Sequence, residues 1–236
     1  MFNQFSKSPA KISLIAIALL ALSGCASAPD PRLAVAAPEL TAGDSWAYEQ
    51  RNGYNRELMQ TLAVNVLDVR AGDITLRIAP SNAPAEFIQT INRELNPRRN
   101  AMVLGPPRDF EPAYDAYKFP LNVGQTWRTE SKSVDPISGK LLTFKIWGRV
   151  ASAEKIRVPA GEFDTLKIVR QVYPDDDEWW RSGTRIEETE WYAPAAKRIV
   201  KREEKSAYTD TASGWPPLVR KGDWVITTLT SFKLEK

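Results

Sequence analysis

The side chains available for catalysis are few, because the 236 residues include no histidine and one cysteine, Cys25. The absence of histidine excludes Ser-His-Asp and Cys-His catalysis and every histidine metal site. Ser-Lys catalysis needs an S-x-x-K motif in a fitting context, and the segment Ser152 to Lys155 is more typical of a surface strand end. The composition therefore predicts a protein that is not an enzyme.

Two groups of carboxylates could act on a substrate or a cation. Glu188 and Glu190 would share one face of a strand while Glu187 faces the other way, which allows a glycosidase with two working carboxylates. Pairing with the basic residues of 197–202 on a neighbouring strand explains them more simply. The run 175–178, DDDE, could bind Ca²⁺, but its spacing is not that of an EF-hand and a solvated hairpin loop is the simpler reading. We expect neither a metal nor a cofactor.

Tryptophan is the residue type that most suggests binding, with eight in the chain. If Trp179 and Trp180 lie on a strand, at most one of them points into the core. The other is exposed unless a ligand, a lipid surface or a partner covers it. Trp215 lies beside two prolines in a late loop and offers a second aromatic edge. Capping of an open end of the β-core is the structural alternative, but we expect Trp179, Trp180 and Trp215 to form the working surface.

The strands that must position these residues are indicated by a set of sequence motifs that occurs twice. Each copy contains L-x-x-G-x-[S/T]-W-x-x-E, then V-x-A-G-[D/E]-[I/F], then T-L-[K/R]-I. The first copy occupies 40–49, 69–74 and 75–78, and the second occupies 121–130, 158–163 and 165–168. The repetition predicts two tandem β units, 40–117 with a proline-rich connection and 118–236 with a closing strand. Trp46 and Trp127 should then be buried in equivalent places.

The pattern around both copies favours strands. Asn52-Gly53 predicts a tight hairpin turn, and alternating apolar residues follow it. Segment 85–95 could be a helix or a strand, and the repeat alignment favours a strand. The last segment, from Trp224 onward, alternates and could pair back onto the sheet. The fold class that this predicts is all-β and mainly antiparallel, a curved sheet or half-open barrel with little helix.

Three segments carry a family resemblance: Phe119 to Trp127, Val158 to Phe163 and Glu190 to Pro194. Together they resemble the TapB-like secreted bacterial domains of unknown function, over roughly residues 118–205. Those domains are similar to the curved sheets of the LolA/LolB lipoprotein-carrier class, which wrap an apolar cavity. The resemblance implies a fold and a compartment and supplies no catalytic residues. Ala195 stands where the family usually has glycine, so this turn could differ.

The N-terminus resembles a lipoprotein signal peptide. A positive start and an apolar run from Ile12 to Leu22 precede Leu-Ser-Gly-Cys25, and the run is too short to span a bilayer. The resemblance implies cleavage of 1–24, a diacylglycerol on the Cys25 sulfur, an acylated amine and a tether over 25–39. Ala26 after the cysteine points, by the same resemblance, to an outer-membrane lipoprotein facing the periplasm.

The charge of the mature chain argues against nucleic acid as a partner. Cleavage would remove two lysines and no acids, so the net charge of +3 becomes +1. Two functions stay open. One is a non-enzymatic binding or carrier module for an apolar ligand. The alternative is a structural or assembly partner of another envelope protein. A large apolar cavity would favour the carrier, and a concave side filled by the protein's own side chains would favour the partner.

Overall fold

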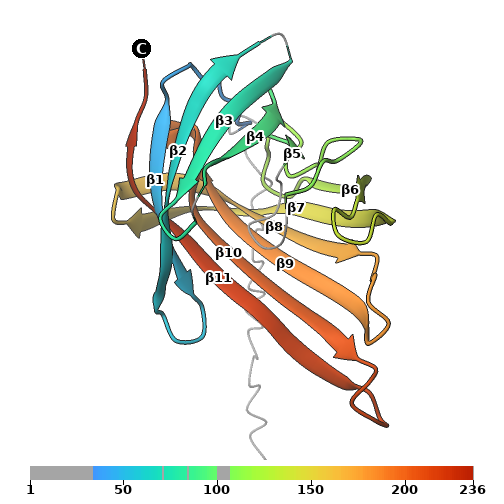
Figure 1. Cartoon of the computed structure of the whole chain (residues 1–236). Coiled ribbons are helices and arrows are strands. Elements are labelled where there is room, and N and C mark those ends of the chain that lie inside the picture. Colours follow the sequence, from blue (N-terminus) through green and yellow to red (C-terminus); the bar gives the residue numbers. More distant parts are fainter. Residues whose placement is uncertain (1–33, 71, 84, 100–106, 236) are drawn as a thin grey trace, which may run out of the picture.

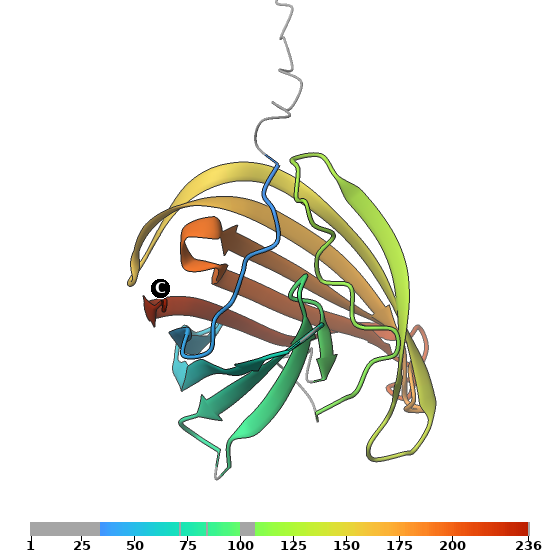
Figure 2. The same cartoon turned by 90° about the horizontal axis from the view of Figure 1, so that it is seen from above.

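One antiparallel sheet accounts for nearly the whole structure, a computed structural model that describes residues 34–70, 72–83, 85–99 and 107–235 (Figure 1). Eleven strands follow the order β5-β4-β3-β2-β1-β11-β10-β9-β8-β7-β6. The sheet is strongly curved but does not close into a barrel (Figure 2). The predicted all-β fold is confirmed. The strands are β1 (Ser45–Asn52), β2 (Leu58–Val69), β3 (Asp73–Pro80), β4 (Phe87–Asn92), β5 (Pro97–Arg99), β6 (Thr126–Val134), β7 (Leu141–Val158), β8 (Gly161–Pro174), β9 (Arg181–Ala193), β10 (Arg198–Asp210) and β11 (Leu218–Lys233).

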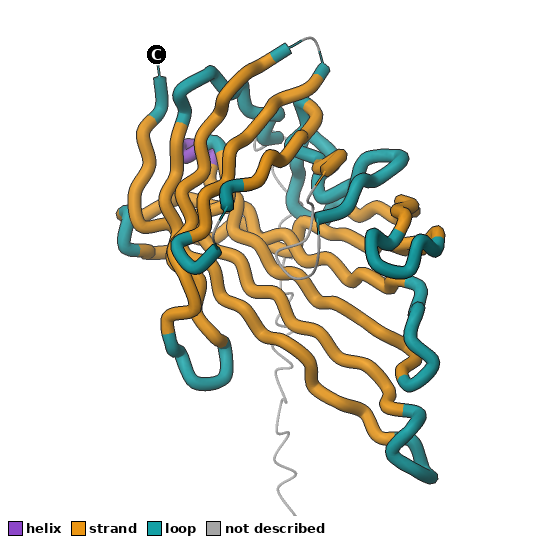
Figure 3. Tube along the Cα trace, viewed as in Figure 1, coloured by secondary structure: helices purple, strands orange, loops and turns teal. Residues whose placement is uncertain are grey.

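Helix is nearly absent from the described part of the chain. It consists of one 3₁₀ turn, Pro194–Ala196, between β9 and β10 (Figure 3). No helix within these residues has the length and the apolar character needed to cross a bilayer. Segment 85–95 contains β4, so the strand prediction is confirmed there.

Alternation along the strands builds the core on the concave side. Val64 and Val66 of β2 and Phe144 and Ile146 of β7 are buried, whereas Lys145 between the last two faces solvent. Because successive side chains of a strand point to opposite faces, this alternation fixes which face of the sheet collects apolar surface.

Trp46 and Trp127 have matching surroundings. Each is the second residue of the first strand of a meander, β1 to β5 or β6 to β10. Before each, a glycine with positive φ, Gly43 or Gly124, donates its backbone N–H over 2.9 Å to a carbonyl of the next strand. Glycine suits these places because its φ values of 96° and 88° are unfavourable for other residues. Both rings are buried. A duplication as the origin of this similarity remains a prediction, and Ala71 of the first copy lies outside the described residues.

The closing strand takes a central place. β11 pairs with β10 on one side and with β1 on the other, so it joins the two meanders into one sheet. The sequence predicted a strand that pairs back, and it is confirmed, although the sheet stays open between β5 and β6.

A connecting segment, residues 107–121, crosses the open side of the sheet, and we call it the strap (green in Figure 2). Asp109 forms a β-bridge with Arg99 of β5, and Glu111 forms one with Lys132 of β6, so the strap contacts both edge strands. Its far end, Leu121, pairs with Val35 through two backbone hydrogen bonds of 2.8 and 2.9 Å. The segment from residue 34 is therefore attached to the folded body. The predicted signal peptide, Cys25 and the rest of the predicted tether lie outside the described residues.

Candidate functional site

Beneath the strap, five charged side chains form a buried ion network. They come from three adjacent strands: Arg170 from β8, Glu188 and Glu190 from β9, and Arg202 and Glu204 from β10. In the sheet register Arg170 is opposite Glu188, Glu188 is opposite Glu204, and Glu190 is opposite Arg202. The alternation that builds the core thus brings three acids and two arginines together on the concave face.

Distances within this network are short. Arg170 Nε lies 2.6 Å from Glu188 Oε2, and its Nη2 lies 2.8 Å from Glu190 Oε1. Arg202 Nη2 lies 2.8 Å from Glu188 Oε1 and also contacts Glu204. Both arginines are therefore shared between carboxylates, as the planar guanidinium allows.

The strap is bonded directly to this network. The Tyr117 hydroxyl donates to Glu190 Oε2 over 2.6 Å, and Arg170 Nη1 donates to the Ala116 carbonyl over 3.1 Å. The Arg170 guanidinium also lies 5.6 Å from the centre of the Tyr117 ring. The ion network consequently holds the strap as well as the three strands.

Burial and charge pull the pKa values of these groups in different directions. Burial raises the pKa of Glu190, but the charges of Arg170 and Arg202 outweigh it and lower the pKa to about 2. For Glu204 burial dominates over the attraction of Arg202, and the pKa is raised. Burial, followed by the charge of Glu190, raises the pKa of Tyr117 well above its ordinary value.

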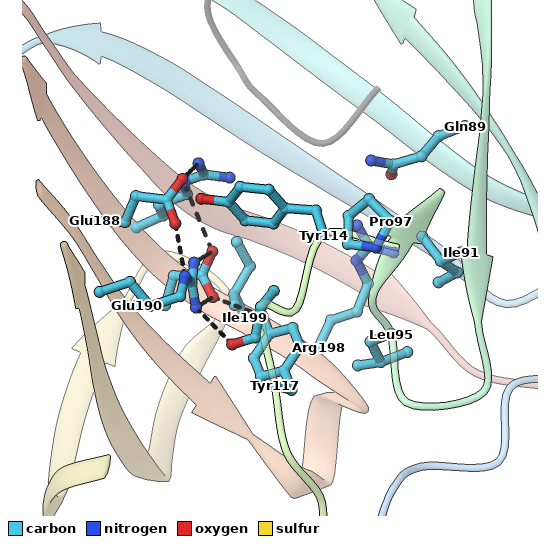
Figure 4. Close-up of a pocket in the computed structure, with 13 residues that line it drawn as sticks. Gln89, Ile91, Leu95, Pro97, Tyr114, Tyr117, Glu188, Glu190, Arg198 and Ile199 are labelled. Carbon is cyan, nitrogen blue, oxygen red and sulfur yellow. Dashed lines mark hydrogen bonds and ion pairs between the residues drawn. The ribbon is translucent and has the colours of Figure 1, made fainter. Parts of the chain in front are cut away.

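A small polar cavity adjoins the network (Figure 4). Its volume is about 80 Å³, and its walls come from the strap, the β4–β5 turn and strands β8 to β10. The buried Tyr114 hydroxyl and Arg198 Nε are among the groups that line it, and neither makes a hydrogen bond within the described part of the chain. A space of this size and polarity suits a few water molecules rather than an apolar ligand.

The predicted binding residues lie elsewhere, at one end of the sheet. Trp179 and Trp180 are in the turn between β8 and β9, so the expectation of strand positions on opposite faces is wrong for this pair. Trp179 and Trp215 are 83% and 92% exposed. The Thr211 N–H donates to the Trp180 carbonyl over 2.8 Å, and its hydroxyl donates to the Trp179 carbonyl over 3.1 Å. The turn that bears Trp179 and the turn that bears Trp215 are therefore held together.

Trp180 is a packing residue of this end. Its ring meets Tyr208 edge-on at 5.5 Å, and its indole N–H donates to Glu178 over 3.2 Å. The Arg181 guanidinium lies 5.6 Å from the ring centre. Only part of its surface is exposed, which leaves Trp179 and Trp215 as the free aromatic side chains of the pair of turns.

The acidic run 175–178 lies in the same turn and contacts protein groups. Asp175 accepts the Thr143 N–H over 2.8 Å, and Asp177 lies 2.5 Å from Lys140 Nζ. Across the residues that the structure describes, no group of three or more histidine, cysteine, aspartate or glutamate side chains is placed to hold a metal ion.

Arg170 and Glu204 are the network residues that the sequence interpretation missed. The predicted partners of Glu188 and Glu190 were the basic residues of 197–202, and Arg202 does pair with both. Lys197 pairs with Asp44, and Lys201 pairs with Glu203 on the other face. The available signal for Arg170 was its alternation with Ile168 and Val172, both fully buried.

Comparison with known proteins supports the fold. The crystal structure of a candidate lipoprotein from Parabacteroides distasonis matches with a TM-score of 0.54 at 15% identity over 84% of this chain and 99% of that one. A candidate exported protein from Bacteroides fragilis, described as having a YmcC-like fold, matches with a TM-score of 0.49 at 14% identity over 85% of this chain and 99% of that one. No family model and no curated protein matches the chain. The resemblance to TapB-like and LolA/LolB domains remains a prediction.

Proposed function

We propose that the protein is a non-enzymatic lipoprotein of the cell envelope, anchored through acylated Cys25, that docks onto another envelope protein with its paired turns. The observation that carries the docking role is the exposure of Trp179 and Trp215 on two turns that are hydrogen-bonded to each other. Paired, exposed tryptophans offer large apolar area at low entropic cost, and such residues dominate many interfaces.

The anchor is supported by the lipobox-like segment that ends at Cys25 and by the similar solved structure, which is that of a candidate lipoprotein. Residue 26 is alanine, which favours the periplasmic face of the outer membrane as the destination. Val35 is fixed to the strap, so the acyl chains would lie at most about 35 Å from this point.

Transport of an apolar ligand is the weaker candidate. The concave side is filled by the strap and by buried rings that include Trp46, Trp127 and Tyr114. The cavity left beneath the strap measures about 80 Å³ and is polar. A further hollow of about 390 Å³ opens beside the turns, but charged side chains form much of its wall. Pockets for apolar ligands are lined mainly by apolar side chains, and neither of these two spaces is.

The same geometry argues against a catalytic role for Glu188 and Glu190. Glu188 and Glu190 are bound to two arginines, and Tyr117 occupies a further oxygen of Glu190. A glycosidase would need one protonated acid beside the scissile bond, and Glu190 does not fit that role because its pKa is lowered to about 2.

Photo-crosslinking in the producing bacterium tests the docking role. A photoreactive phenylalanine analogue replaces Trp215 in the full chain, and in a matched control it replaces Ile137, which is 85% exposed on the neighbouring β6–β7 turn. We expect one discrete protein adduct from position 215 that Trp179→Ala abolishes. The absence of an adduct, or the same adducts from position 137, would contradict docking through the paired turns.

A further inference from the structure

The outer face of the sheet carries a groove that plays no part in the docking role proposed above. It crosses β8, β9, β10 and β11 and has a volume of about 620 Å³. Its floor includes Glu187, whose alternation with Glu188 places it on the face opposite the buried network. The groove is thus separate from the polar cavity beneath the strap.

Positive charge predominates along this groove. Arg185, Lys205 and Lys221 line it, and Glu187 is the acid among its lining residues. Arg185 and Lys221 are exposed, and neither makes an ion pair within the described ranges. Lys205 lies 3.8 Å from Glu203 and 4.6 Å from the centre of the Trp224 ring. In a mature chain whose predicted net charge is only +1, this local excess of cations would attract an anion.

Aromatic rings alternate with these cations. Tyr54 is 53% exposed and meets Trp224 edge-on at 5.5 Å, with its hydroxyl bonded to the Gly222 carbonyl over 3.0 Å. Tyr173 lines the opposite side and packs against Trp147 at 5.0 Å. These contacts fix the rings while leaving apolar surface and polar atoms at the groove.

The length of the groove suits a chain-like ligand better than a single lipid headgroup. Neighbouring strands lie about 4.8 Å apart, so a ligand that crosses β8 to β11 spans about 14 Å. This is the length of a few linked sugar rings. A recessed floor also suits an inserted chain better than a flat bilayer, which contacts protruding side chains.

We propose that this groove binds an anionic oligosaccharide chain. Carboxylate or phosphate groups of the chain pair with Arg185 and Lys221, which have no ion-pair partner in the described protein. The sugar rings lie with their C–H faces against Tyr54 and Tyr173, and ring hydroxyls meet Gln171 and Glu187. The aromatic contacts recognise the sugar rings, and the cations select an anionic oligosaccharide over a neutral one.

Calorimetric titration of the full chain in a zwitterionic detergent tests this site. The probes are an oligogalacturonate of four residues, a phosphate-bearing oligosaccharide of the same length and a neutral glucan of the same length. We expect saturable binding of at least one anionic probe, weakened about tenfold or more by Arg185→Ala with Lys221→Ala, since bonds to charged groups contribute that much.

A matched control removes the same two residue types from the same face. Arg149 and Lys132 are exposed, lie outside the groove and make no ion pair in the described part of the chain. Arg149→Ala with Lys132→Ala should change the affinity less than about twofold, because distant cations act only through a screened field. Circular dichroism confirms that each variant is folded.

Four results would overturn the proposal. The first is no saturable binding of either anionic probe. The second is an equal loss of affinity in the control variant, and the third is equal binding of the neutral glucan. Inorganic phosphate and vesicles with anionic lipids complete the series: binding that these probes reproduce fully would assign the site to a phosphate ion or to a membrane surface instead.

Discussion

Arg170 and Glu188 face each other across β8 and β9 with 2.6 Å between Nε and Oε2, and both side chains are buried completely. A charge in such a place is tolerated only because its partner is also fixed there. The strap completes this arrangement through Ala116 and Tyr117. The ion network therefore attaches the strap to the sheet.

Arg170→Met should destabilise the protein by about 3–5 kcal/mol, because it leaves Glu188 and Glu190 buried without one of their cations. Chemical denaturation of the full chain measures the loss. Arg149→Met, an exposed arginine on β7, is the control and should change the free energy of unfolding by about 0.5 kcal/mol or less. Adding Glu188→Met and Glu190→Met to Arg170→Met should recover stability, and a variant that stays equally unstable would show that charge is not the cause.

Acid should weaken the fold through Glu190. Its pKa falls from an ordinary 4.5 to about 2 in the folded protein, so ionised Glu190 stabilises the fold above pH 4.5. This contribution is lost as the pH falls toward 2. The contribution of Glu204 to the pH dependence of stability has the opposite sign. Because its pKa is raised in the folded protein, protonation of Glu204 stabilises the fold.

Denaturation curves between pH 2 and 5 check this linkage. Glu190→Gln should flatten the pH dependence in that interval. Glu187→Gln, on the outer face of the same strand, should leave the dependence as it is. Equal slopes in the wild type and in Glu190→Gln would exclude Glu190 as the source.

The three tryptophans at the paired turns should differ in their effect on stability. Trp180→Ala removes the ring contact with Tyr208 and should cost about 0.5–1.5 kcal/mol. Trp179→Ala and Trp215→Ala should each stay within about 0.5 kcal/mol of the wild type, because these rings are exposed. Thermal denaturation of the three single variants measures these differences in stability. A large loss with Trp215→Ala would identify that ring as part of the core.

The variant Cys25→Ser tests the predicted lipid attachment and membrane localisation. Without the sulfur no diacylglycerol can be attached, so the variant should be released from the membrane fraction or remain unprocessed. Fractionation and labelling with a fatty-acid probe report the outcome. Processing of the wild type that resists globomycin, or soluble wild-type protein in the periplasm, would contradict the lipoprotein assignment.

The fold was largely predictable because alternation is a local signal. Val64, Ile146 and their neighbours fall on the face that periodicity assigns to them, and the predicted pairing of Glu188 and Glu190 with Arg202 is confirmed. The turn at Trp179 and Trp180 was less accessible, since the end of a strand depends on its partners rather than on its own residues.

The centre of the candidate site was not predictable in this way. An arginine on a strand is assigned to solvent by default, because buried arginine is rare unless it is paired. The partners that keep Arg170 inside come from β9 and from the strap, 18 to 54 residues away in the sequence. No short-range pattern contains that information.

The placement of β11 between β1 and β10 also sets an order of events during biogenesis. The first meander ends at β5, yet its strand β1 finds one of its two neighbours only when residues 218–233 arrive. A chain that crosses a membrane from its N-terminus would stay unfinished until this late strand emerges. Folding should therefore follow translocation and be slow, since pairings this distant form late. In that interval the unpaired edge of β1 would be open to pairing with other chains and to aggregation.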